Sequence, residues 1–217
     1  MNPISKLLVA IKDRRLTFET ERVIQNSFRT FGINVTRYKH GNPTQDPLAK
    51  MLASQKIDVV LDVGANIGQY TNHLFKIGYK GKVISFEPIP YAHAKLVEAA
   101  ATNPMWEVAE QCAIGEKDGF TKINISKNSV SSSLLQQTGT QINVEPAAAY
   151  TRAVNVPIKK LDTVAKNYMK GKVMLKLDVQ GYEDKALKGA AKILPKVAGI
   201  QIEMSLVALY KGEIVFE

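Results

Sequence analysis

Two acidic residues, Asp62 and Glu87, each end a short apolar run of the sequence. Asp62 is followed by Gly64 and Gly68, which favour a tight turn, a close approach of backbone N–H groups to a ligand and then a helix N-terminus, where anionic groups bind well. An acidic side chain at the end of the second strand, such as Glu87, accepts hydrogen bonds from both hydroxyls of a ribose. The pattern predicts a site for a nucleoside-bearing ligand. The alternatives are a tight turn without a ligand and a surface glutamate that caps a helix.

The turn after Asp62 narrows the class of ligand. A nicotinamide-binding fingerprint is GxGxxG, and Asn66 occupies the place of its second glycine. A carboxylate at Asp62 suits an amino group or a cation better than a pyrophosphate. The ends of the two strands together predict an adenosine with an amino-acid tail and a positive charge, which is S-adenosylmethionine.

A third acidic residue, Asp178, is accompanied by a lysine inside an apolar run. Lys176 and Asp178 point to the same face of the predicted strand 173–179. A buried lysine must be paired or have a lowered pKa. One interpretation is that Asp178 orients or deprotonates an acceptor hydroxyl and Lys176 tunes it; the other is an ion pair that fixes adjacent strands. Glu203 ends the next strand and is a partner of Lys176, a substrate ligand or an exposed strand end.

The other reactive side chains are weaker candidates. Cys112 is the one cysteine, so an intramolecular disulfide is excluded, and it is either a small buried residue or a contact of the adenine. His73 and His93 fall inside predicted helices, whereas His40 lies in an irregular stretch from which it could reach the site as part of a lid. The polar loop 129–133 is either a linker or a flap over the substrate. No ligand cluster for a metal is visible, so we predict no metal.

The elements that must position these residues alternate between strands and helices. Strands separated by helices of 10 to 13 residues require crossover connections, which predicts an α/β fold with a doubly wound, mostly parallel sheet. Ligands of such sheets bind beyond the carboxyl ends of the strands. The predicted strands are 57–63, 82–87, 106–114, 173–179 and 197–203, with extra extended pieces at 121–126 and 152–158; the predicted helices are 67–78, 90–101 and 182–194.

Composition and charge exclude several classes of protein. The 217 residues are 45% hydrophobic and 23% charged, which excludes a disordered or fibrous chain. The net charge of +9 invites a nucleic-acid interpretation, but the middle of the chain is neutral and the lysines of the predicted helix 182–194 follow one solvated face. The apolar stretch 7–11 is too short for a signal peptide or a membrane span, so we expect a cytoplasmic protein. We divide the chain into an N-terminal helical extension, 1–56, and one domain, 57–217.

Seven segments resemble, in order, the motifs of the FkbM-type S-adenosylmethionine-dependent methyltransferases. They are DVGANIGQYT (62–71), FEPIPYAHAKL (86–96), CAIG (112–115), SSSL within 131–135, LDT (161–163), KLDVQGYEDKALKGA (176–190) and IEMSLVALYKG (202–212). The resemblance implies a Rossmann-like methyltransferase fold and O-methylation of a hydroxyl on a sugar, glycan or secondary metabolite. It also implies roles for individual residues: Asp62, Gly64, Ala65, Asn66 and Gly68 at the methionine end of the cofactor, Glu87 and Pro88 at its ribose, and Cys112 and Ala113 beside its adenine.

One further expectation follows from the resemblance, and two alternative functions remain. Proteins of this fold end with a further helix and an antiparallel strand pair, and the sequence stops at Glu217, so we expect a domain that lacks its C-terminal strands. The alternative functions are an RNA methyltransferase, suggested by the charge, and a non-catalytic cofactor-binding protein, suggested by the short C-terminus. One observation argues against the RNA enzyme. The predicted strand 173–179 ends in DVQG rather than in the Asn/Asp-Pro-Pro-aromatic element of enzymes that methylate base amino groups.

Overall fold

The computed structural model describes residues 46–215, nearly all of them in a compact unit that begins at Pro47. Most of the predicted helical extension, residues 1–56, and the candidate lid residue His40 lie outside the described residues. The described end of that extension is helix α3, Pro47–Gln55. In the described part of the chain, no helix combines the length and the hydropathy needed to cross a membrane.

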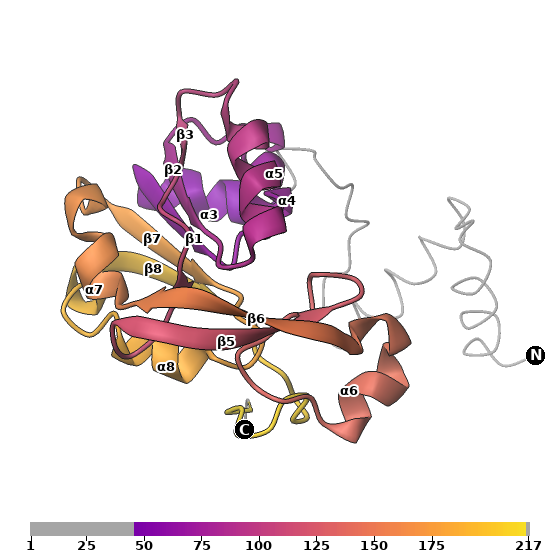
Figure 1. Ribbon diagram of the computed structural model, residues 1–217. Helices are drawn as coiled ribbons and strands as arrows, with labels where there is room; N and C mark the ends of the chain where they lie inside the picture. Colours follow the sequence, from indigo (N-terminus) through magenta and orange to yellow (C-terminus); the bar gives the residue numbers. More distant parts are fainter. Residues whose placement is uncertain (1–45, 216–217) are drawn as a thin grey trace, which may run out of the picture. The chain divides into compact units, whose positions relative to one another are not determined.

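A five-stranded parallel sheet forms the centre of this unit (Figure 1). Its strand order is β3-β2-β1-β7-β8, and all four pairs of neighbours are parallel. The predicted α/β fold with a doubly wound, mostly parallel sheet is confirmed. The strands are β1 (Val59–Val63), β2 (Lys82–Phe86), β3 (Trp106–Val108), β7 (Val173–Leu177) and β8 (Val197–Ile202).

Helices cover both faces of the sheet because its central strands are apolar at every second position on either side. Leu61 and Leu175 face α7 (Leu161–Val164) and α8 (Glu183–Lys188) in one buried cluster. Val60 and Met174 face the opposite way and pack with residues of α3, α4 (Gln69–Lys76) and α5 (Pro90–Ala100). Burial on both faces is the physical reason that these strands are nearly continuous apolar runs.

A second, smaller sheet lies beside the first and has the order β4-β6-β5 (Figure 1). The long strands β5 (Gly119–Ser126) and β6 (Tyr150–Lys159) are antiparallel, and β4 (Ala113–Ile114) adds to β6 in parallel. The connection between β5 and β6 carries α6 (Gly139–Val144) and the 3-10 turn η1 (Pro146–Ala148). Ile123 and Ile158 join residues of α5 in a third apolar cluster, which anchors the small sheet next to the carboxyl end of β2.

Two predicted elements have different bounds in the structure. The predicted strand 106–114 is two strands in two sheets, because the chain leaves the main sheet after β3 and pairs with β6 from Ala113 onward. The predicted helix 182–194 keeps its α-helical geometry only over α8, which ends at Lys188; Gly189 and the turn η3 (Leu194–Lys196) follow. The turn η2 (Lys166–Tyr168) connects α7 to β7. Apolar periodicity shows burial, but it does not show a change of pairing partner.

Among the described residues, β8 is the edge strand next to β7. Leu175 on β7 and Ile200 on β8 are direct partners in the register, yet Leu175 is fully buried and Ile200 is 48% exposed.

The difference in burial between these partners predicts a difference in stability. Leu175→Ala should lower the free energy of unfolding by about 2–5 kcal/mol because it leaves a cavity in the core. Ile200→Ala should cost less than about 1 kcal/mol, since about half of the Ile200 side chain is already exposed to water. Urea denaturation of both variants measures the difference. An equal, large cost at Ile200 would mean that the edge is covered by chain outside the described residues or by a partner.

Candidate functional site

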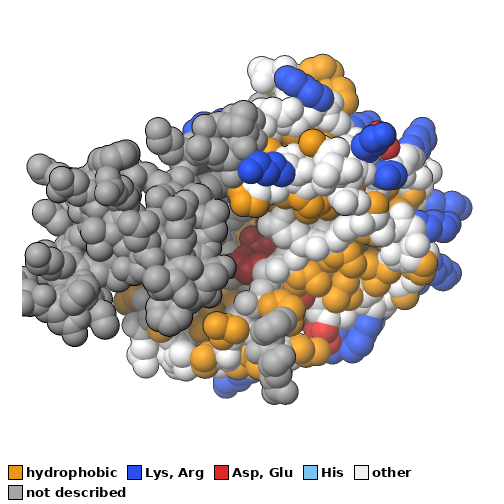
Figure 2. All heavy atoms as spheres, turned by 180° about the vertical axis from the view of Figure 1, so that it is seen from behind, with side chains coloured by type: hydrophobic (Ala, Val, Ile, Leu, Met, Phe, Trp, Pro, Cys, Tyr) orange, Lys and Arg blue, Asp and Glu red, His pale blue; other side chains and the backbone are white. Residues whose placement is uncertain are grey.

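A cavity of about 570 Å³ lies beyond the carboxyl ends of β1, β2 and β7, where ligands of such sheets bind. Its volume is in the range of small-molecule and cofactor sites, about 300–1,000 Å³. The charged side chains that line it among the described residues are Glu87, Lys176, Asp178 and Glu203. Figure 2 shows acidic side chains set back in a hollow of the surface, whereas most lysines and arginines lie toward the outline of the molecule.

The turn after β1 forms one wall of the cavity. Gly64 has φ 78° and lies so close to β7 that a Cβ atom would collide with the carbonyl oxygen of Asp178. Asn66 also has a left-handed backbone, with φ 49°. Gly64, Ala65 and Asn66 line the cavity as predicted, but Gly68 packs behind it against the Trp106 ring and does not line it.

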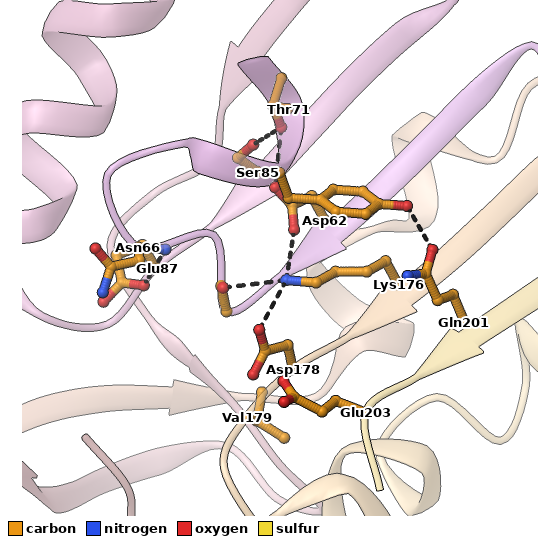
Figure 3. A network of polar contacts seen from close by, with 12 residues as sticks. Asp62, Asn66, Thr71, Ser85, Glu87, Lys176, Asp178, Val179, Gln201 and Glu203 are labelled. Atoms are coloured by element: carbon orange, nitrogen blue, oxygen red, sulfur yellow. Dashed lines mark hydrogen bonds and ion pairs between the residues drawn. The ribbon is translucent and has the colours of Figure 1, made fainter. Parts of the chain in front are cut away.

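Glu87 follows β2 and is held by the turn from β1. One carboxylate oxygen accepts a hydrogen bond from the backbone N–H of Asn66 at 2.8 Å (Figure 3). The other accepts one from the backbone N–H of Ile89, also at 2.8 Å. Burial raises the pKa of Glu87 to about 7, although these two hydrogen bonds oppose the shift. Glu87 and Pro88 both line the cavity. Each oxygen keeps a lone pair for a ligand.

Asp62 is fully buried and does not line the cavity. It is the register partner of Lys176 on β7, and its Oδ1 lies 3.0 Å from the lysine Nζ (Figure 3). Its Oδ2 accepts a hydrogen bond from Thr71 of α4 at 2.9 Å. The geometry is that of the predicted ion pair between adjacent strands, so a ligand is not needed to explain the carboxylate.

The ammonium of Lys176 connects three groups. Besides Asp62 it donates to the carbonyl oxygen of Gly64 at 3.3 Å and lies 3.6 Å from Asp178 Oδ2. The ring of Tyr70 lies 5.1 Å from it, within cation–π range. Burial disfavours the charge, but the two carboxylates more than offset this, and the pKa of Lys176 is raised. Lys176 therefore remains a cation.

Asp178 and Glu203 meet at the ends of β7 and β8. Asp178 is partly exposed to the cavity, with 32% of its side chain accessible. A hydrogen bond with Asp178, together with burial, raises the pKa of Glu203 to about 7. Glu203 is not an ion-pair partner of Lys176, whose acidic partners among the described residues are Asp62 and Asp178. One predicted alternative for Glu203 is thus wrong, and Figure 3 shows its carboxyl group facing Asp178.

The opposite end of the cavity is apolar. Cys112, Ala113 and Ile114 line it at the start of the small sheet. Burial raises the pKa of the Cys112 thiol to about 11, so it remains protonated near neutral pH. A small, uncharged surface of this kind suits a flat ring.

Sequence reasoning missed two contributors to the site, Tyr70 and Gln180, and left the serine loop undecided. Ser129 and Ser133 of that loop line the cavity, and Ser129 accepts a hydrogen bond from the Asn66 side chain at 3.3 Å. Gln180 also lines the cavity. The sequence carried a signal for it, because Gln180 lies two residues after Asp178 and directly before Gly181. Among the described residues, no group of three or more His, Cys, Asp and Glu side chains is arranged to hold a metal ion.

Residues 62–216 match the family described as the methyltransferase FkbM domain. The match covers more than half of the chain. The chain belongs to the FkbM methyltransferase family. The resemblance seen in the sequence motifs is thereby confirmed, and the FkbM domain supports methyl transfer as the general activity. No match was found among curated proteins or among solved structures.

The buried ion pair of the FkbM domain predicts strong coupling between its two members. Lys176→Met and Asp62→Asn should each cost about 3–5 kcal/mol of stability, because each leaves a buried charge without its main partner. The double variant should cost at least about 1 kcal/mol less than the sum. Urea denaturation of the cycle measures the coupling. The exposed pair Lys95–Glu98 is the control, with an expected coupling of about 0.5 kcal/mol or less; equal couplings in the two cycles would contradict the buried pairing.

The carboxyl pair predicts a dependence of stability on pH. Glu203 binds its proton more tightly in the folded chain than in the unfolded chain, where its pKa is near 4.5. The stability that it contributes is therefore present below that value and is lost as the pH rises through about 7. In Glu203→Gln, the free energy of unfolding should fall less between these pH values than in the unmodified chain. Denaturation at several pH values tests this, and parallel curves for the two proteins would refute it.

Proposed function

We propose that this protein transfers the methyl group of S-adenosylmethionine to a hydroxyl oxygen of a sugar, glycan or secondary metabolite. The observation that carries the proposal is that one cavity joins a buried carboxylate after β2 to a partly exposed carboxylate after β7, with an apolar surface beside the first. The membership of the FkbM family supports methyl transfer.

The chemistry of the lining fits the cofactor. Glu87 would accept hydrogen bonds from the ribose hydroxyls, because both of its oxygens are already oriented by backbone N–H groups. Cys112 and Ala113 would lie against the adenine. The backbone of the turn 64–66 would hold the amino-acid end, whereas Asp62 would act behind this turn, through Lys176. When bound, the cofactor supplies a methyl group on a cationic sulfur.

Asp178 would act on the acceptor. Its carboxylate is reachable from the cavity and lies 3.6 Å from the Lys176 ammonium, so it can accept a hydrogen bond or a proton from a hydroxyl group. Glu203, which shares a hydrogen bond with Asp178, would hold this carboxylate in place or contact the acceptor. In an in-line displacement, holding the hydroxyl in position supplies much of the rate enhancement, and a base adds about 10² to 10⁴.

The charges of the cavity favour an acceptor without phosphate groups. Three carboxyl groups line it, and Lys176, the one cation among its described lining residues, is already paired with Asp62. A polyanion such as RNA would meet carboxylates at the reacting end. The proposal is therefore a small or glycan hydroxyl acceptor rather than a nucleic acid.

Calorimetric titration with S-adenosylmethionine tests the first step. The unmodified protein should bind it, and Glu87→Gln should weaken binding about tenfold or more, because one of the two acceptor oxygens is replaced by an amide donor. Glu98→Gln, on the exposed face of α5, is the matched control and should change the dissociation constant less than about twofold. Absence of binding by the unmodified protein would reject the proposal.

The same proteins test the transfer step. Intact-mass screening of hydroxylated sugars and metabolite pools identifies the acceptor as a gain of one methyl group. Asp178→Asn should then lower kcat by about 10² or more while leaving the affinity for S-adenosylmethionine nearly unchanged. Full turnover by this variant would remove Asp178 from the reaction.

A further inference from the structure

Gln180 lies in the cavity wall two residues after Asp178 and has an unusual backbone. Its φ is 55°, in the left-handed region that residues with a Cβ atom seldom adopt. Such a conformation persists only where the surroundings determine it, and these residues cluster at functional sites. Ser133 of the serine loop supplies one of the determining contacts, since its hydroxyl donates to the Gln180 carbonyl at 2.6 Å.

Both ends of the Gln180 side-chain amide are engaged. Its Nε2 donates to Asp178 Oδ1 at 2.7 Å, and its Oε1 accepts a hydrogen bond from the Tyr210 hydroxyl at 2.7 Å. A reversed amide would place Oε1 against the Asp178 carboxylate, and two acceptors repel each other. The carboxylate and the tyrosine therefore select the same orientation of the amide.

Tyr210 is built into the structure as a buried donor. It is 1% exposed, and its ring packs where a Cβ atom on Gly181 would come within 3.0 Å. Its hydroxyl proton faces two acceptors, Gln180 Oε1 at 2.7 Å and the carbonyl oxygen of Ser131 at 3.2 Å, and the first contact is the shorter. Burial raises the pKa of Tyr210 well above its usual range, so the hydroxyl remains protonated and can donate.

Asp178 is thus held from several elements. Lys176 approaches it from β7, Glu203 from the end of β8 and Gln180 from the turn after β7. The carboxyl group of Glu183 on α8 also acts on it electrostatically, whereas the Tyr210 hydroxyl remains protonated. Lys176 places a positive charge and Gln180 an amide donor beside this carboxylate, whereas Glu203 places a second acidic group there.

We propose that Gln180 is a positioning residue which, held by Tyr210, orients the Asp178 carboxylate and stabilises its ionised form. The catalytic part of this inference rests on the proposed function, because it assigns Asp178 the contact with the acceptor hydroxyl. The arrangement also ties the segment around Tyr210 to the reacting end of the cavity. Residues that are distant in the sequence thereby set the state of one carboxylate.

Carboxyl ¹³C NMR of the full chain tests the proposal without cofactor or acceptor. The pH midpoints of the two hydrogen-bonded carboxyl groups, Asp178 and Glu203, are measured together, and Asp178→Asn identifies the signals. Gln180→Leu should raise the lower midpoint by about one pH unit, a tenfold change in proton affinity, because a donor to the ionised form is lost. Gln136→Leu makes the same change at an exposed glutamine and should leave both midpoints in place.

A second variant keeps the test decisive if Gln180→Leu does not fold. Tyr210→Phe removes only the hydroxyl that holds the amide, and it should raise the lower midpoint about half as far, a roughly threefold change in proton affinity. Unchanged midpoints in every variant that folds would overturn the proposal. The dependence of kcat on pH is measured for the same variants. If the carboxyl midpoint shifts but the acidic limb of this pH profile does not, the inference that Asp178 acts in the reaction is overturned. Failure of the unmodified protein to bind S-adenosylmethionine would reject the proposed function instead, and the carboxyl titration would still decide the role of Gln180.

Discussion

The site depends on one buried ion pair. Asp62 and Lys176 face each other across the neighbouring strands β1 and β7 inside the sheet, and removing either would leave a buried charge without its main partner. The same ammonium contacts the Gly64 carbonyl, in the turn that lines one wall of the cavity, and Asp178, at the reacting end. The Lys176 side chain thus connects the turn after β1 to the carboxylate of Asp178. Its burial makes the register of the two strands stringent, because any slip of one residue along β7 would place the lysine on the opposite face of the sheet.

The cavity has two chemically different ends. Around Glu87 the turn after β1 and the apolar residues at the start of the small sheet offer shaped, mostly uncharged surface, which suits a nucleoside. Around Asp178 the lining is acidic, and Lys176, the one cation near it in the described part of the chain, is already paired with Asp62. Among the described residues, Lys176 is the one basic residue that lines the cavity, so the net charge of +9 does not by itself indicate the chemistry of this cavity. In the function proposed above, the mostly uncharged end around Glu87 would hold the methyl donor and the acidic end around Asp178 would hold the hydroxyl acceptor.

Three residues with a Cβ atom adopt a left-handed backbone where they line the cavity: Asn66, Ser129 and Gln180. They come from the turn after β1, the serine loop and the turn after β7. The Asn66 side chain donates a hydrogen bond to the Ser129 hydroxyl, and the Gln180 carbonyl accepts one from Ser133. The Gln180 side chain also donates to Asp178 in its own turn. Unfavourable local conformations at three separate turns are tolerated because the rigid sheet and the buried Tyr210 hold the segments that carry them. This is the pattern expected of a preorganised site rather than of ordinary connecting loops.

Local patterns in the sequence were sufficient to predict the parallel sheet, the turn at Gly64, the acidic residue after β2 and the common face of Lys176 and Asp178, because burial and strand alternation are properties of neighbouring residues. They were insufficient where the partner lies far along the chain. The predicted strand 106–114 did not show that its two ends pair in different sheets, since both ends carry apolar residues. Asp62 near the carboxyl end of β1 resembled a ligand contact, but the register of β7 places Lys176 opposite it, and the two form an ion pair. The link from Tyr210 through Gln180 to Asp178 has no local signature, and only the folded chain brings these groups within hydrogen-bonding distance.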